Sequence, residues 1–86
     1  MADGAPRTLN LLKPGQRAIV ANVRGEGSAL HQRLMEMGVF AGAEIKVIRF
    51  APLGDPMEVS VQGYNLSVRK AEAAFVDVTE VPSAEC

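Results

Sequence analysis

The hexapeptide Ala51-Pro52-Leu53-Gly54-Asp55-Pro56 interrupts two segments of apolar and polar alternation near the middle of the chain. Neither proline has an N–H to donate to a sheet ladder, and the glycine is free to adopt φ > 0, so this stretch cannot continue a strand. Each proline also pushes the residue before it toward extended geometry. We therefore predict a stiff connection between two strands. Leu53, at its centre, is either tucked back onto the core or offered to a partner.

Residues 44–50 and 57–62 flank this connection, and we predict that both are strands. Each is rich in β-branched residues and alternates in part between apolar and polar side chains, which is the period of a half-buried strand. Similar patterns predict three more strands, over residues 17–23, 64–69 and 75–81. We expect the core to be lined from two of these strands by Met57, Val59, Val61, Tyr64, Leu66 and Val68.

A short helix is predicted over residues 29–37. Ser28 is a suitable N-cap residue, and Leu30, Leu34 and Met37 recur at the spacing of one helical face. Gly38 follows at the position where helices commonly end in the left-handed conformation. The apolar face of this helix is expected to cover the core.

Five short strands and one inserted helix indicate a small, partly open antiparallel barrel. An open sheet of this size would leave both edges unpaired, and curling the sheet reduces that exposure. We expect one domain over residues 9–81, preceded by a disordered tail at residues 1–8 and followed by a tail at residues 82–86.

Composition narrows the class of protein. The 86 residues are 48% hydrophobic, which is enough for one modest core. The net charge of −1 argues against a nucleic-acid-binding domain, which usually has a basic face. No apolar run approaches the roughly 18 residues that span a bilayer, and the N-terminal residues lack a secretory signal. One cysteine excludes an internal disulfide and suits a reducing compartment, so we expect a cytoplasmic protein.

The sequence lacks a catalytic constellation. The one histidine, His31, and the one cysteine, Cys86, are far apart, and the cysteine is in the predicted tail. The glycine-bearing loop at residues 24–27 has neither of the common phosphate-binding patterns. We therefore predict that the protein is not an enzyme.

Three segments together carry a family resemblance: Arg33-Leu34-Met35-Glu36-Met37-Gly38-Val39, Ala51-Pro52-Leu53-Gly54-Asp55-Pro56, and Leu66-Ser67-Val68-Arg69-Lys70 followed by Glu72 and Ala73. In this combination the chain resembles the FeoA family of bacterial ferrous iron transport over roughly residues 9–81. The resemblance implies an SH3-like β-barrel. It also implies that the protein works with FeoB, a membrane ferrous iron permease with a cytoplasmic G-protein domain.

Two functions follow as expectations. The first is an adaptor that docks on FeoB and modulates transport, through Arg33, Arg69 and the loop residues Pro52, Leu53, Gly54, Asp55 and Pro56. The alternative is an autonomous metal-binding or metal-sensing domain, with a weak Fe²⁺ or Zn²⁺ site built by His31, Cys86 and carboxylates, across a homodimer. Tight iron or zinc sites usually cluster their ligands at short spacing, and this chain has no such cluster.

Overall fold

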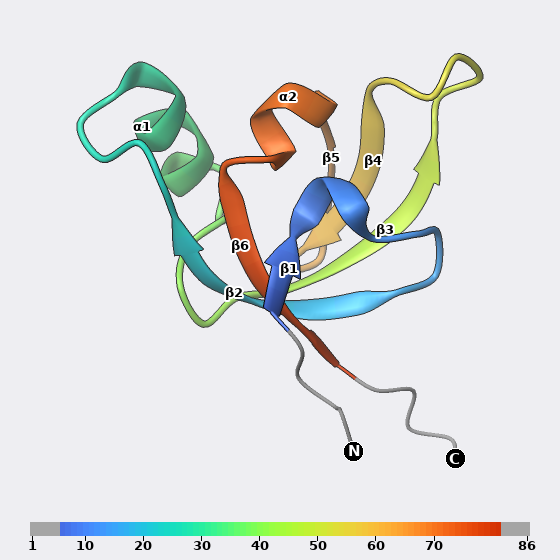
Figure 1. The fold of residues 1–86 in the computed structure, drawn as a ribbon, viewed down its shortest axis with the longest axis horizontal. Coiled ribbons are helices and arrows are strands. Elements are labelled where there is room, and N and C mark those ends of the chain that lie inside the picture. The colour runs from blue at the N-terminus through green and yellow to red at the C-terminus, as the bar shows by residue number, and fades with distance from the viewer. Residues whose placement is uncertain (1–5, 82–86) are drawn as a thin grey trace.

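The structure, a computed structural model, describes residues 6–81 and consists of one antiparallel sheet with short helices (Figure 1). Its elements are β1 (Pro6–Thr8), the 3₁₀ helix η1 (Leu9–Leu11), β2 (Arg17–Val23), α1 (Ala29–Glu36), β3 (Glu44–Phe50), β4 (Met57–Val61), β5 (Tyr64–Val68), α2 (Lys70–Ala73) and β6 (Val76–Val81). The strand order across the sheet is β1-β6-β2-β3-β4-β5. The sheet curls around a single core, as predicted. None of the helices within residues 6–81 is long and apolar enough to cross a membrane.

The predicted count of five strands is wrong, because β1 is a sixth. It pairs with β6 in the register Pro6↔Thr79 to Thr8↔Asp77, inside the segment that we expected to be a disordered tail. Three residues that include a proline are too short to show an alternating pattern, so only the pairing with a distant strand defines β1. The other five strands begin and end within one residue of their predicted bounds. Residues 1–5 and 82–86, which hold the rest of the predicted tails, lie outside the described residues.

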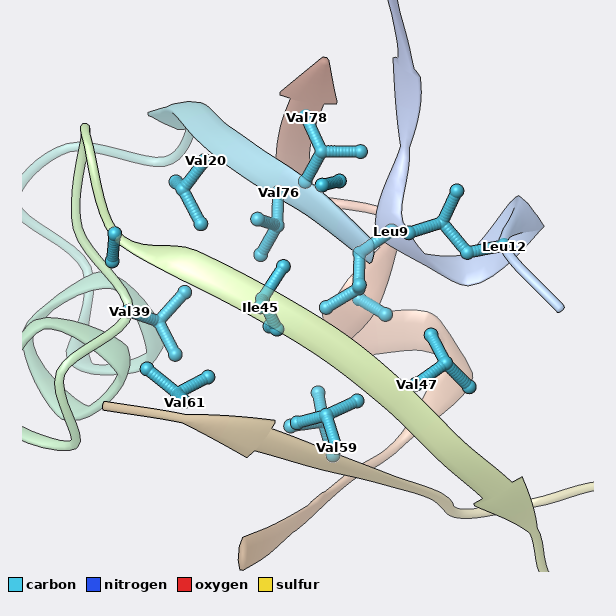
Figure 2. Packing of buried hydrophobic residues seen from close by; sticks show 14 of the residues in the cluster. Leu9, Leu12, Val20, Val39, Ile45, Val47, Val59, Val61, Val76 and Val78 are labelled. Atoms are coloured by element: carbon cyan, nitrogen blue, oxygen red, sulfur yellow. The ribbon is translucent and has the colours of Figure 1, made fainter. Parts of the chain in front are cut away.

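The core is a cluster of buried aliphatic side chains that point toward one another from β2, β3, β4 and β6 (Figure 2). Met57, Val59 and Val61 are fully buried, which confirms the predicted inner face of β4. In β5 the prediction is partly wrong. Val68 is buried and Leu66 is half-buried, but Tyr64 is 69% exposed. Tyr64 pairs with the fully buried Val61, but it lies on β5, the edge strand of the sheet, which has a neighbouring strand on one side only.

Helix α1 forms where it was predicted and ends one residue earlier, at Glu36. The Ser28 hydroxyl accepts a hydrogen bond from the His31 backbone N–H at 3.1 Å, which satisfies a donor of the first turn. Leu34 is fully buried, and Leu30 and Met37 pack against the core as partly buried neighbours. The predicted apolar face therefore covers the core.

The barrel has two distinct ends. Helices α1 and α2 and the tip of the β3–β4 connection lie at the end away from the start of β1 and the end of β6 (Figure 1). Register shifts between Val20 and Asn22 in β2, and between Val47 and Arg49 in β3, mark bulges that increase the local bend of the strands. The curled sheet thus brings segments that are distant in sequence to the helical end of the barrel.

Candidate functional site

The β3–β4 connection, residues 51–56, is here called the proline loop. Its ends are joined by a hydrogen bond from the Ala51 N–H to the Pro56 carbonyl at 2.9 Å. A second bond, from the Gly54 N–H to the Ala51 carbonyl at 2.7 Å, closes a turn around Pro52 and Leu53. Gly54 has φ +89°, a conformation that glycine adopts without the strain of a side chain. The loop is therefore a closed structure with defined backbone bonds.

Helix α2 holds the proline loop in place from one side. Asp55 Oδ1 accepts a hydrogen bond from the backbone N–H of Lys70, the first residue of α2, at 3.0 Å. Lys70 Nζ lies 4.6 Å from the centroid of the Phe50 ring, at the end of β3, which is within cation–π range. Helix α2 thus contacts the loop through Asp55 and the end of β3 through Phe50, and neither contact was evident in the sequence.

Leu53 is 95% exposed at the tip of the proline loop. The leucine therefore does not fold back to plug the barrel, which was one of the two alternatives in the sequence. Single exposed leucines are common on protein surfaces. This one stands on a loop that is closed by two backbone hydrogen bonds and joined to α2 by the bond between Asp55 and Lys70.

A surface hollow of about 350 Å³, the α1–α2 hollow, lies beside the proline loop. Its lining residues are Arg33, Met37, Pro56, Ser67, Arg69 and Glu72. Three of them are predicted site residues: Arg33 of α1, Pro56 of the proline loop, and Arg69, the N-cap residue of α2. The fold brings these three residues together. The hollow is open to solvent, whereas ligand pockets usually bury most of the ligand surface.

Glu72 also lines the hollow, and it was not among the predicted site residues. Its carboxylate pairs with the guanidinium of Arg33, and its Oε1 accepts the backbone N–H of Arg69 at 3.1 Å. One side chain thus joins α1 to the first turn of α2. A glutamate three residues after an N-cap position is a known capping signal, and this spacing could have identified it.

The metal hypothesis is not tested by the described residues. His31 is half-buried on α1, and Cys86 lies outside residues 6–81. Within that range, no group of three or more histidine, cysteine, aspartate or glutamate side chains is arranged to hold a metal ion.

Removing the carboxylate of Asp55 should loosen the attachment of the proline loop. We expect Asp55→Ala to lower the free energy of unfolding by about 1 kcal/mol, because the Lys70 N–H loses its acceptor at the start of α2. Urea denaturation of the purified protein measures this. Asp55→Asn is the matched control, since it keeps an oxygen acceptor and should lose less than half as much. Equal stability of the alanine variant and the wild type would show that the contact is not stabilising.

The fold and the site define a small antiparallel β-barrel with an exposed leucine at a loop tip, beside an open surface hollow. Residues 7–80 match the sequence model of the family described as FeoA domain, and the chain belongs to that family. FeoA domains are non-enzymatic accessory domains, which agrees with the prediction that this protein is not an enzyme.

The chain is also similar in sequence and structure to individual members of this family. The chain is 36% identical over 75 residues to the Fe(2+) transport protein A/Fe(2+) transporter FeoB fusion protein of Porphyromonas gingivalis, a match that covers 87% of this chain and 9% of the fusion protein. The solution structure of FeoA from Chlorobium tepidum is 44% identical, with a TM-score of 0.82, and the match covers 92% of this chain and 74% of that one.

A zinc complex of FeoA from Stenotrophomonas maltophilia, described as an SH3 domain protein, is 31% identical with a TM-score of 0.74. That match covers 84% of this chain and 88% of the other. The predicted SH3-like fold is confirmed.

Proposed function

We propose that this protein is an accessory component of ferrous iron uptake that docks on the FeoB transporter, on its cytoplasmic side, and modulates transport. Membership of the FeoA family supports the link to ferrous iron transport. The Porphyromonas gingivalis relative supports the choice of partner, because it carries an FeoA part and FeoB in one polypeptide. Joining two domains in one chain keeps them at a high effective concentration, which suits domains that act together.

The observation that carries the proposal is the 95% exposure of Leu53 on the proline loop. A partner that buries a leucine side chain gains on the order of 1.5–3 kcal/mol from removal of apolar surface from water. The prolines and the contacts of Asp55 and Lys70 have already ordered the loop, so little conformational entropy is lost on binding. Core formation does not need this side chain, because the flanking strands supply the buried residues.

Leu53→Ser tests the proposal by separating binding from folding. We expect ferrous iron uptake to fall in a strain that lacks the native copy, while the melting temperature stays within about 2 °C of wild type, well below 1 kcal/mol for a domain of this size. Both quantities are measured on the same variant, with expression checked by immunoblot.

Tyr64→Ser is the matched control for this experiment. It also removes an exposed large side chain, but at the opposite end of β4 from the proline loop. Uptake should be unchanged in the control. Wild-type uptake with Leu53→Ser, or an equal loss with Tyr64→Ser, would show that docking does not depend on the proline loop.

A further inference from the structure

Five of the six arginines are neutralised within the protein. They form ion pairs with carboxylates at N···O distances of 3.5 Å or less, in the pairs Arg7–Glu80, Arg17–Glu44, Arg24–Asp77, Arg33–Glu72 and Arg49–Glu58. The exception is Arg69, whose guanidinium has no ion pair or side-chain hydrogen bond within residues 6–81. Its side chain is exposed, and it lines the α1–α2 hollow together with Pro56.

The carboxylates near Arg69 are already engaged by other groups. Glu72 binds the Arg33 guanidinium and the Arg69 backbone N–H, and only 21% of its side chain is exposed. Asp55 accepts the Lys70 backbone N–H. A guanidinium has five N–H donors in a planar fork, and here those donors face solvent at the edge of the site.

The local charge has the opposite sign to that of the whole chain. The α1–α2 hollow and the adjoining part of the proline loop form one corner of the surface, with three cations, Arg33, Arg69 and Lys70, and two carboxylates, Asp55 and Glu72. This corner therefore has a net charge of +1, whereas the whole chain has a net charge of −1. The Lys70 ammonium is occupied by the face of Phe50. Arg69 is therefore the cation of this corner that has neither an ion pair nor a cation–π contact within residues 6–81.

We infer that Arg69 receives a carboxylate of the docking partner, next to an apolar pocket that takes Leu53. This inference rests on the proposed function and specifies its partner surface: an apolar depression flanked by an aspartate or a glutamate. A carboxylate matches the fork of a guanidinium with two parallel hydrogen bonds.

The test is equilibrium binding of the full-length protein to purified, detergent-solubilised FeoB, at about 50 mM and about 300 mM NaCl, since screening weakens exposed charge pairs. At low salt we expect Arg69→Gln to weaken binding roughly tenfold, and the difference from wild type to shrink at high salt. Arg69→Lys keeps the positive charge but loses the planar fork of N–H donors, so its affinity should lie between those of the wild type and Arg69→Gln. Neither variant should change the melting temperature.

Lys46→Gln is the control for net charge. Lys46 is exposed on β3 and lines a different hollow, with Glu44 and Ser60, so the same loss of charge there should leave binding at the wild-type level. Wild-type affinity of Arg69→Gln at low salt, or equal weakening by Lys46→Gln, would overturn the inference. If Leu53→Ser still loses affinity in that case, the proposed function stands and only the carboxylate contact fails. If Leu53→Ser also binds like wild type, the proposed function fails too.

Discussion

Replacing Leu34 with alanine is expected to lower the free energy of unfolding by about 2–4 kcal/mol. Leu34 has no exposed surface and is the one buried residue of α1, so its side chain carries much of the attachment of this helix to the core. Truncation removes buried methyl and methylene groups and leaves a cavity that the rigid sheet can fill only in part. Small domains are stable by only about 5–15 kcal/mol, so this is a large share.

Urea denaturation, followed by far-ultraviolet circular dichroism, measures the loss. Met35→Ala is a close control, because it truncates the next residue of the same helix, whose side chain is 41% exposed. The control should stay within about 0.5 kcal/mol of wild type, as surface substitutions usually do. Equal stability of the two variants would mean that α1 does not cover the core in solution.

The parts of the fold that could be predicted from sequence are those with local signals. Two prolines and a glycine marked the proline loop, and alternating apolar residues marked β3 and β4 on either side of it. Strand β1 gave no such signal, because three residues are held in place only by pairing with β6, about seventy positions away. Tyr64 has the right period for the core, but the sequence does not show that its strand, β5, is an edge strand of the sheet.

In the candidate site, too, the features with local signals could be predicted from sequence, and those that depend on distant contacts could not. Leu53 stood out as the one large apolar residue among Ala, Pro, Gly and Asp, and its exposure excludes the alternative in which it is tucked back onto the core. The α1–α2 hollow could not be predicted, since it depends on the ion pair between Arg33 and Glu72, 39 positions apart. A motif can nominate both residues, but only the packing of the two helices shows that they meet. Whether the partner binds there stays a prediction.

Gly38→Val should be the second large loss of stability, on the order of 2–3 kcal/mol, since a β-branched residue is strained at positive φ. Gly38 has φ +96° and ends α1 as the sequence predicted. The Val39 N–H donates to the Leu34 carbonyl at 2.9 Å, and the Gly38 N–H donates to the Met35 carbonyl at 3.1 Å. These two bonds form a Schellman motif, and the accompanying apolar residues, Leu34 and Val39, are both fully buried.

The cost of Gly38→Val comes from the backbone rather than from lack of space. A Cβ on Gly38 would lie 3.5 Å from Val61 Cγ1 and 3.6 Å from Gln62 Cγ, which are ordinary contact distances. Gly38→Asn is therefore the informative control, because asparagine tolerates the left-handed conformation and should lose less than half as much stability in urea. A valine variant within about 0.5 kcal/mol of wild type would contradict the left-handed cap. Equal losses for valine and asparagine would instead assign the cost to side-chain crowding. The left-handed conformation of Gly38 sets where α1 ends and directs the next residue, Val39, into the core. Because Arg33 of the same helix lines the α1–α2 hollow, the end of α1 also helps to hold that hollow beside the proline loop.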